Sequence, residues 1–371
     1  MRKKRVLLLS EGFGTGHTQA AHALAVSLKK NSRDVLTKVI ELGGFLHPTI
    51  TPWIIGAYRR AVISRPKLVG KVYRSQYNKS INRLTQLVLH RFYYKQTTEL
   101  IRQLRPDTVV CTHPFPNIII SRLKRLGLNV PLCTVITDYD AHGTWVSPEV
   151  DKYLVSTENV KQKLLARGIP DTKIEVTGIP VHPNFWEQHN KAEIRARFRL
   201  REMPTVLVMG GGWGVIKNEE MLIRAANWRD RIQLIFCLGS NEKFRAKLAE
   251  QEIFRHPNIH MLGFTKNIDQ LMEVSDLLIT KPGGMTCTEA LTKGVPMLFY
   301  NPIPGQEEEN CQYFTERGFG FELKKIEDVD HWFRLLLEQY SEFTCRRAKI
   351  AQAVSKYNPN RCSKTIMEFL K

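Results

Sequence analysis

Residues 6–30, VLLLSEGFGTGHTQAAHALAVSLKK, contain an apolar run, a glycine-rich turn and a helical pattern in succession. An uninterrupted run of Val and Leu is typical of a strand that is buried on both faces of a parallel sheet. Residues 205–226, TVLVMGGGWGVIKNEEMLIRAA, repeat the order of strand, glycine turn and helix. The sequence therefore predicts two α/β domains, each of which begins with this pattern.

Short apolar runs alternate with helical patterns along the rest of the chain. We expect strands at 5–10, 35–41, 108–112, 132–137, 205–209, 233–238, 277–280 and 297–300. The stretches between them are long enough for crossover helices, which predicts a doubly wound α/β architecture. The polar, proline-containing residues 181–204 are a candidate linker. We expect two Rossmann-like domains, 1–180 and 205–355, that face each other across a cleft.

Length and composition exclude several classes of protein. The chain has 371 residues, which suits two domains, and its 43% hydrophobic and 25% charged residues exclude a disordered chain, a collagen and a multi-span membrane protein. Its 55 Lys and Arg against 36 Asp and Glu give a net charge of +19, which indicates nucleic acid, an anionic membrane or phosphorylated ligands as partners. The seven Cys include no C-x-x-C pair, which favours the cytosol.

The first glycine loop is Gly12-Phe-Gly14-Thr-Gly16-His17. Its spacing departs from the G-x-G-x-x-G fingerprint of dinucleotide sites, although glycines before a helix let backbone N–H groups approach a ligand. His17 should lie in the first helical turn, where the helix dipole disfavours the charged ring and leaves a neutral base for a hydroxyl group. The alternative is a polar residue near a helix start, and the preceding glycines favour the base.

Two further glycine loops follow strands in the second half. Residues 210–214, GGGWG, place four glycines in five positions, which indicates close approach to a ligand or, as the alternative, a tight turn. Residues 281–290, KPGGMTCTEA, place glycines before another helix. Glu289 either completes a capping box with Thr286 or, from the first helical turn, accepts hydrogen bonds from two ribose hydroxyls. The amides of residues 283–286 would then hold a diphosphate.

Residues 42–98 contain no Asp or Glu but ten Lys or Arg, with aromatic residues between them. A basic, aromatic-rich surface is what a peripheral protein uses on anionic lipid, while a nucleic-acid patch and a merely solvated face are the alternatives. The residues expected to contact the membrane are Trp53, Arg59, Arg60, Lys67, Lys71, Arg74 and Arg83.

Five motifs together resemble glycosyltransferase family 28, which has the GT-B fold. They are GxGxGH at 12–17, GGGWG at 210–214, LGFTKNIDQLM at 262–272, TKPGGMTCTEA at 280–290 and PGQEEEN at 304–310. Within this family the chain is most similar to processive diacylglycerol β-glucosyltransferases and monogalactosyldiacylglycerol synthases. The resemblance covers nearly the whole chain, and the pair formed by the last two motifs is highly specific.

The resemblance implies roles for individual residues. His17 would be the catalytic base, and residues 356–371 would form a final helix that packs on the first domain. Phe264 would pack against uracil while the backbone of Thr265 reads the edge of the base. The other residues expected to bind the donor are Gly14, Gly16, Gly211, Gly212, Gly283, Gly284, Thr286, Glu289, Gln306 and Glu307.

Residues 137–142, TDYDAH, keep only the first two positions of the family pattern. Asp138 is a candidate to orient His17 or to face the acceptor, and His142 is a weaker candidate for the same task. The D-Y-D sequence also resembles the metal motif of a different glycosyltransferase fold. We expect no metal site, because in GT-B enzymes backbone amides and a helix dipole take the place of the metal.

The function implied is an inverting transfer of glucose or galactose from a UDP-sugar to diacylglycerol or a glycosyl-diacylglycerol. The product would be a β-linked glycolipid, the UDP-sugar is a substrate, and no cofactor is expected. We expect a cytoplasmic protein bound peripherally to the anionic inner face of the cell membrane, with no nucleic-acid partner. The alternatives are a different lipid acceptor and a non-catalytic UDP-sugar sensor.

Overall fold

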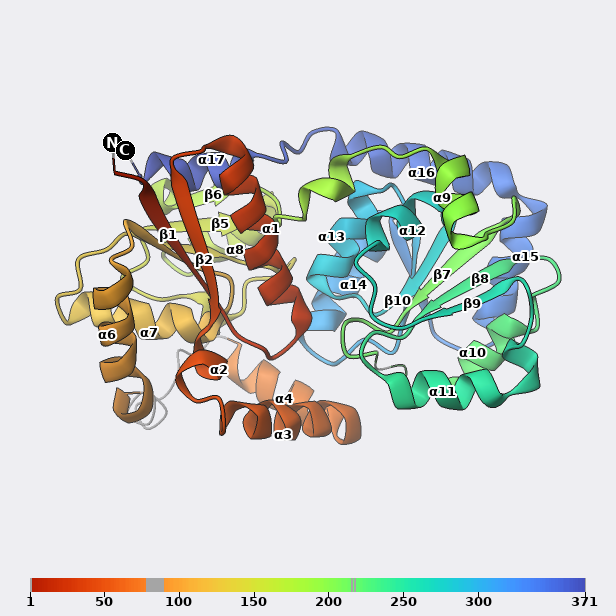
Figure 1. The fold of residues 1–371 in the computed structure, drawn as a ribbon, viewed down its shortest axis with the longest axis horizontal. Coiled ribbons are helices and arrows are strands. Elements are labelled where there is room, and N and C mark those ends of the chain that lie inside the picture. The colour runs from red at the N-terminus through yellow and green to blue at the C-terminus, as the bar shows by residue number, and fades with distance from the viewer. Residues whose placement is uncertain (1, 78–89, 215, 217, 371) are drawn as a thin grey trace. The chain divides into compact units, whose positions relative to one another are not determined.

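The computed structural model describes residues 2–77, 90–214, 216 and 218–370. Contacts divide the chain into two compact units. Unit 1 consists of Met1–Pro183, Ile303–Glu309 and Tyr357–Lys371, and unit 2 of Asn184–Pro302 and Asn310–Lys356. The first and last segments of the chain therefore belong to unit 1. Figure 1 shows α17 in the same half of the picture as β1 and α1.

Unit 1 is built on six parallel strands in the order β2-β1-β3-β4-β5-β6. The strands are β1 Lys4–Ser10, β2 Val35–Glu41, β3 Thr108–Cys111, β4 Leu132–Val135, β5 Lys152–Val155 and β6 Ile174–Val176. The helices are α1 Thr15–Asn31, α2 Leu42–Leu46, α3 Thr51–Ser64, α4 Pro66–Gln76, the π-helix η1 His90–Tyr94, α6 Lys95–Leu104, α7 Pro114–Arg125, the short 3-10 helix η2 Gly143–Trp145, α8 Glu158–Leu165 and α17 Arg361–Glu368. The first four strands confirm those expected from the sequence.

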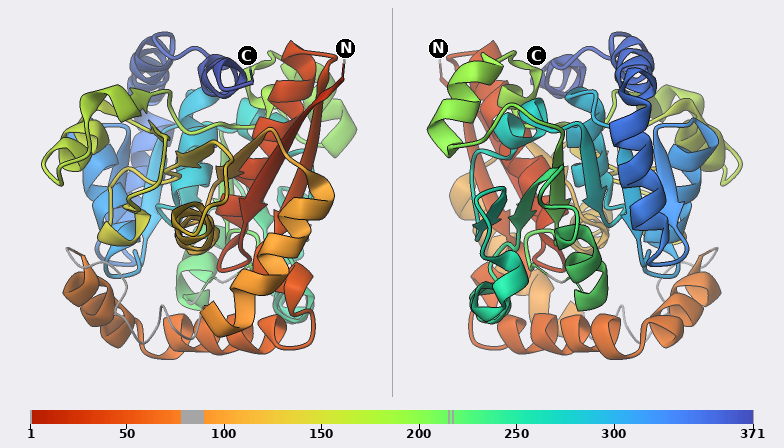
Figure 2. Two further views of the ribbon diagram at one scale, coloured as in Figure 1. Left: turned by 90° about the vertical axis from the view of Figure 1, so that its left-hand side faces the viewer. Right: turned by 90° about the vertical axis from the view of Figure 1, so that its right-hand side faces the viewer.

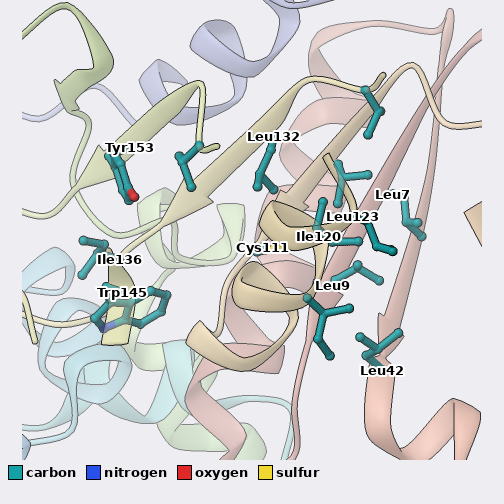
Figure 3. Packing of buried hydrophobic residues seen from close by; sticks show 14 of the residues in the cluster. Leu7, Leu9, Leu42, Cys111, Ile120, Leu123, Leu132, Ile136, Trp145 and Tyr153 are labelled. Atoms are coloured by element: carbon teal, nitrogen blue, oxygen red, sulfur yellow. The ribbon is translucent and has the colours of Figure 1, made fainter. Parts of the chain in front are cut away.

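The sheet of unit 1 is buried on both faces, as the apolar run of β1 predicts. Leu7 and Leu9 belong to one hydrophobic cluster, and Val6 and Leu8 belong to another, because alternate side chains of a strand point to opposite faces. Figure 3 shows Leu7 and Leu9 in the first cluster together with Ile120 and Leu123 of α7. Helices thus cover both sides of a parallel sheet, which is the doubly wound arrangement.

The second cluster joins the two ends of the chain. Leu24 and Leu28 of α1 share it with Cys362 and Ile366 of α17. The hydroxyl of Ser27 donates a hydrogen bond of 2.9 Å to that of Ser363. The last helix is therefore part of the core of unit 1.

α3 and α4 form a separate layer at the end of the sheet where β1 and β2 finish (Figures 1 and 2). α2 follows β2 directly and α3 lies beside it. Within the described part of the chain, no helix combines the length and the apolar character needed to cross a bilayer.

Unit 2 has six parallel strands in the order β12-β11-β10-β7-β8-β9. The strands are β7 Thr205–Met209, β8 Gln233–Cys237, β9 Ile259–Leu262, β10 Leu277–Thr280, β11 Met297–Tyr300 and β12 Gly320–Leu323. The helices are α9 Lys191–Phe198, α10 Glu219–Ala226, α11 Glu242–Glu250, α12 Ile268–Val274, α13 Gly284–Thr292, α14 Gln306–Glu316, α15 Asp328–Glu338 and α16 Tyr340–Val354. α14 starts in the segment assigned to unit 1. The four strands expected in this half are confirmed.

Candidate functional site

The strand order of unit 1 places one group of loops together. β1 pairs in parallel with β2 on one side and with β3 on the other. Successive strands are therefore added on opposite sides of β1, and the strand order reverses between β1 and β3. Ligands of open α/β sheets bind beyond the carboxyl ends of the strands at such a switch point. The loops found there are the first glycine loop after β1 and Thr112–His113 after β3.

His17 lies in the first turn of α1, which begins at Thr15 after Gly14. Its Nδ1 is 2.6 Å from the hydroxyl oxygen of Thr137, which lies just after the end of β4. Burial lowers the pKa of His17 to about 4, so the ring is neutral at neutral pH. The sequence argument relied on the helix dipole for this neutrality, whereas burial is the larger cause in the structure. In the tautomer whose Nδ1–H donates to the Thr137 hydroxyl, Nε2 of the neutral ring is left to accept a proton.

Asp138 directly follows Thr137 in sequence, but its side chain binds elsewhere. Its carboxylate accepts a hydrogen bond from the side-chain amide of Gln306, and its carbonyl accepts one from Ser156. Thr137 thus contacts Nδ1 of His17 in the place where we expected Asp138. Asp138 retains its position next to Thr137, at the edge of this site.

Asp140 and His142, the other polar residues of this loop, stabilise the surrounding structure. Asp140 is buried and accepts hydrogen bonds from the hydroxyl of Tyr77 at 2.8 Å and from Lys163 at 2.5 Å. His142 contacts the carbonyl of Tyr73 at 3.0 Å. These bonds connect the loop after β4 to α4 and α8. Among the described residues, no three His, Cys, Asp or Glu side chains form a group that could hold a metal ion.

Aromatic side chains surround His17, and the sequence argument did not identify them. The ring of His113 meets that of His17 edge to face, with centroids 4.7 Å apart and planes at 83°. The ring centroid of Trp145 in η2 lies 6.0 Å from that of His17. The ring of Phe13 stacks on that of His113, with centroids 5.8 Å apart. Phe13 also meets Tyr58 of α3 at 5.2 Å. The surroundings of His17 are therefore aromatic and largely uncharged.

The first glycine loop has open space on one side and carboxylates on the other. A Cβ at Gly14 would meet nothing within 4 Å, while one at Gly12 would lie 3.3 Å from a carboxylate oxygen of Glu41. Glu11 is buried and accepts hydrogen bonds from the backbone of Gly12 and Gly43. The approach of a ligand is therefore easier at Gly14, and an anion is disfavoured near Gly12.

In unit 2 the other two glycine loops meet at a second switch point. β7 pairs with β8 on one side and with β10 on the other. The GGGWG loop follows β7, and the KPGG loop follows β10. Strand pairing thus brings together two motifs that are far apart in sequence, at the edge where nucleotides bind in this class of sheet.

Glycines of the GGGWG loop serve two different purposes. A Cβ at Gly214 would overlap the carbonyl oxygen of Leu238, so this glycine allows two backbone segments to pack. Gly211 has φ +68°, which favours glycine, and a Cβ there would meet nothing within 4 Å. Gly211, and not Gly214, therefore faces open space that a ligand could use. Gly212 accepts a hydrogen bond at its carbonyl from the backbone of Ser240.

Of the two interpretations of Glu289, the capping box with Thr286 is wrong, and so is the placement of Glu289 in the first helical turn. α13 begins at Gly284 with Gly283 as its N-cap, so Thr286 is already helical. Glu289 consequently lies in the second turn of α13 and not in the first. The N-cap residue Gly283 supplies no side-chain hydrogen bond to the N–H groups of the first turn. A Cβ at Gly283 would meet nothing within 4 Å, so there is open space beside this residue, whose N–H donates to the carbonyl of Lys281 at 2.8 Å.

Glu289 has an unusual electrostatic environment. Burial raises its pKa to about 8, and the nearby carboxylate of Asp269 adds to the effect. Asp269 is itself buried and lies 3.2 Å from Nε2 of His189. A carboxyl group with such a raised pKa is common at binding sites, where a ligand supplies the missing hydrogen bonds.

The loop after β9 holds the two residues expected at the nucleobase. The Phe264 side chain is 61% exposed, which is unusual for a large aromatic ring. The Thr265 hydroxyl accepts a hydrogen bond from the backbone of Asn267 at 3.2 Å, which fixes the turn. An exposed ring on a well-ordered turn can stack on a planar base.

Residues 303–309, which contain Gln306 and Glu307, pack within unit 1. A Cβ at Gly305 would lie 2.5 Å from the ring of Tyr73 in α4. Glu307 accepts a hydrogen bond from the backbone of Ile303 at 2.7 Å, and Arg74 forms an ion pair of 3.0 Å with Glu308. The segment is thus attached both to α4 and, through Gln306, to Asp138.

α3 and α4 carry exposed apolar and basic side chains together. The apolar ones are Trp53, Ile54, Tyr58, Ile63, Leu68 and Val72, and Trp53 is 75% exposed. Of the residues expected to contact a membrane, Arg60, Lys67, Lys71 and Arg74 are exposed, Arg59 is partly buried, and Arg83 lies outside the described residues. We call the exposed side chains of α3 and α4 the basic-aromatic surface.

Comparison with known proteins gives two family matches. Residues 17–181 match the family described as monogalactosyldiacylglycerol (MGDG) synthase, and residues 190–357 match glycosyl transferases group 1. The processive diacylglycerol β-glucosyltransferase of Bacillus subtilis is 31% identical over 338 residues, which cover 88% of this chain and 85% of that relative. The enzyme of the same name from Bacillus pumilus is 30% identical over 369 residues, covering 98% of this chain and 94% of the relative.

Solved structures resemble the whole chain. MurG of Acinetobacter baumannii has a TM-score of 0.62 at 17% identity and covers 98% of both chains. Anabaena HepE, in complex with UDP and glucose, has a TM-score of 0.61 at 15% identity and covers 100% of this chain and 99% of its own. At these identities the likeness shows a shared fold, and it confirms the predicted GT-B fold class.

Proposed function

The chain belongs to the family of the processive diacylglycerol β-glucosyltransferases, and from this premise we propose that it transfers a hexose from a UDP-sugar to diacylglycerol or a glycosyl-diacylglycerol. The hexose is glucose or galactose, and the product is a β-linked glycolipid. The observation that carries the proposal is the partly buried, neutral His17 at the β1–β3 switch point, with Nδ1 on Thr137.

The reaction is a single displacement at the anomeric carbon. Nε2 of His17 takes the proton of the acceptor hydroxyl while its oxygen bonds to the anomeric carbon and UDP leaves with the electron pair. A base in this position contributes about 10²–10⁴-fold to the rate. Asp138, which is bonded to Gln306, lies at the edge of the same site and contacts the acceptor.

The glycine loops of unit 2 hold the UDP part of the donor. Backbone N–H groups of Gly211, Gly212, Gly283, Gly284 and Thr286 bind the diphosphate, helped by the N-terminus of α13. They stabilise the charge that develops as UDP leaves. The open space beside Gly211 and Gly283 supports this assignment.

The remaining donor contacts come from side chains and from the first loop. Glu289 binds the ribose hydroxyls, Phe264 stacks on uracil, and the backbone of Thr265 reads the edge of the base. Gln306 and Glu307 contact sugar hydroxyls. Gly14 and Gly16 let the sugar approach His17, which the open space at Gly14 supports.

The basic-aromatic surface binds the anionic inner face of the cell membrane, which makes the protein cytoplasmic and peripheral. Exposed aromatic rings insert at the headgroup level, and each nearby Lys or Arg contributes about 1 kcal/mol on an anionic surface. The surface adjoins Phe13 through Tyr58. A lipid acceptor therefore reaches His17 from the membrane side of unit 1.

The test is synthesis of glycolipid by the purified protein. Radiolabelled UDP-glucose and UDP-galactose are offered separately with vesicles that contain diacylglycerol, and mass spectrometry identifies the lipid products. We expect a labelled β-glycosyl-diacylglycerol with one donor and a large loss of product in His17→Ala. Absence of labelled lipid with both donors, while UDP still binds, would reject the proposal and favour a sensor. Transfer to a different added lipid alone would correct the acceptor.

A further inference from the structure

A second imidazole, that of His113, lies against His17 in unit 1. The ring centroids are 4.7 Å apart and the ring planes stand at 83°, an edge-to-face contact. His113 directly precedes α7, in the loop after β3. Because β1 and β3 are neighbouring strands, the two loops that follow them meet, and the contact is a consequence of the sheet order.

The tautomer of His113 is fixed by the helix that it caps. Its Nδ1 accepts a hydrogen bond of 3.1 Å from the backbone N–H of Phe115. Nδ1 therefore carries no proton, and the neutral ring has its proton on Nε2. A charged ring would need a proton on both nitrogens and would lose this cap. Burial and the neighbouring His17 also hold the pKa of His113 well below its usual range.

The His17 ring is held from several sides. Thr137 engages Nδ1 at 2.6 Å, His113 meets the ring edge to face, and Trp145 lies 6.0 Å away. Phe13 stacks on His113, with ring centroids 5.8 Å apart and planes at 19°. Of these four neighbours, only His113 has a titratable side chain. Asp138 follows Thr137 on its loop. The carboxylate of Glu41 accepts a hydrogen bond of 2.7 Å from the hydroxyl of Thr18, the residue after His17.

We propose that His113 is a positioning residue for His17: its uncharged ring holds the His17 imidazole with Nδ1 on Thr137 and Nε2 toward the acceptor hydroxyl. The inference rests on the proposed function, in which His17 takes the acceptor proton. His113 itself exchanges no proton in the reaction. A neutral aromatic edge orients the base without trapping its proton, as a carboxylate would, and without repelling it, as a cation would.

Two variants separate positioning from helix capping. His113→Asn retains a good N-cap for α7 but removes the ring, whereas His113→Phe retains a ring edge but removes the cap. If His113 positions His17, kcat falls roughly 10–100-fold in His113→Asn with the KM for UDP-sugar unchanged, because small misplacements of a reacting group cost about that much. His113→Phe should be less stable to heat, yet should retain more turnover per folded molecule than His113→Asn.

A second measurement tests the contact between His113 and His17 in the absence of substrate. NMR spectra of the full chain with isotope-labelled histidine report the tautomer of His17 in the free protein. We expect a single Nδ1–H form in the wild type and averaged ring signals in His113→Asn. Wild-type turnover in His113→Asn, or His17 signals that stay the same in it, would overturn the positioning role. Full activity of His17→Ala would instead remove the base from the proposed function, and this proposal with it.

Discussion

The side-chain amide of Gln306 donates a hydrogen bond to the carboxylate of Asp138, 168 residues earlier in the chain. Asp138 is buried, and Gln306 begins α14 in the segment that packs with unit 1. The bond connects the residue that follows Thr137 to the segment that we propose for the donor sugar. It therefore attaches residues 303–309 to the loop after β4 within unit 1.

We predict that Gln306→Glu destabilises the protein, because it sets a second carboxylate against buried Asp138. The expected loss in the free energy of unfolding is about 3 kcal/mol, the size seen when a buried charge loses its partner. Adding Asp138→Asn should restore most of it, since the Asn amide can donate to the new Glu. Urea unfolding of the four proteins measures this cycle. Equal stability of the single and double variants would show that the bond contributes little.

The pKa of His17, lowered to about 4, makes a prediction about pH. The kcat at saturating UDP-sugar should be constant from about pH 6 to pH 8 and should fall as Nε2 of His17 becomes protonated toward pH 4. The free energy of unfolding should also depend on pH, because of the same lowered pKa of His17. Between the ordinary pKa of about 6.5 and the folded value, the unfolded chain binds more protons, so the folded state loses stability as pH falls through this window.

His17→Gln is the control for both effects. It should lose about 10²–10⁴-fold in kcat. Its free energy of unfolding should also fall less between pH 7 and pH 5 than that of the wild type, since His113 contributes equally to both proteins. Parallel stability curves for the two proteins would mean that His17 titrates normally.

The sequence predicts the strands that are continuous apolar runs and misses the short or mixed ones. β6 has three residues with Glu175 in the middle, and β9 and β12 include His260 and Glu322. In these edge strands one face is only partly covered, so the apolar signal is interrupted. β5, KYLV, is buried but has only four residues. Pairing with the next strand, and not local pattern, defines such segments.

The glycine loops could be found from the sequence, but the surroundings of His17 could not. Glycines after a strand are a local signal, and they led to His17, Gly211 and Gly283. Thr137 lies 120 residues after His17, and it meets the ring only because β4 lies next to β3 and β3 next to β1. His113 has no spacing that marks it, since its position depends on the same strand order. The start of α13 was also misplaced, because a capping pattern can occur inside a helix.

Glu289 should make UDP binding depend on pH. Its pKa of about 8 means that the free protein holds it largely protonated at pH 7. If ribose hydroxyls donate to the carboxylate form, binding releases a proton, and affinity should rise up to tenfold per pH unit until about pH 8. Calorimetric titration with UDP from pH 6 to pH 9 measures this. Glu289→Gln should bind with little change over that range; a level wild-type curve would mean that Glu289 binds as the neutral acid.

The basic-aromatic surface should bind anionic vesicles through particular residues. Lys67→Ala with Lys71→Ala should weaken binding by about 2 kcal/mol, and Trp53→Ala should weaken it further, because an exposed ring no longer inserts. Arg74→Ala is the matched control, since Arg74 is paired with Glu308 and has less charge to offer. Vesicle sedimentation at low and high salt provides the measurement. Equal losses for Lys67→Ala and Arg74→Ala would contradict the distinction between free and paired cations.

The last helix should determine the stability of unit 1, although it is remote from the proposed chemistry. Ile366 of α17 is fully buried in the cluster that contains Leu24 and Leu28 of α1, so truncation leaves a cavity between the two helices. Ile366→Ala should lower the free energy of unfolding by about 2–5 kcal/mol. Lys364→Ala changes an exposed residue of the same helix and should cost less than about 0.5 kcal/mol. Urea unfolding followed by circular dichroism compares them, and similar midpoints for both variants would mean that α17 is not part of the cooperative core.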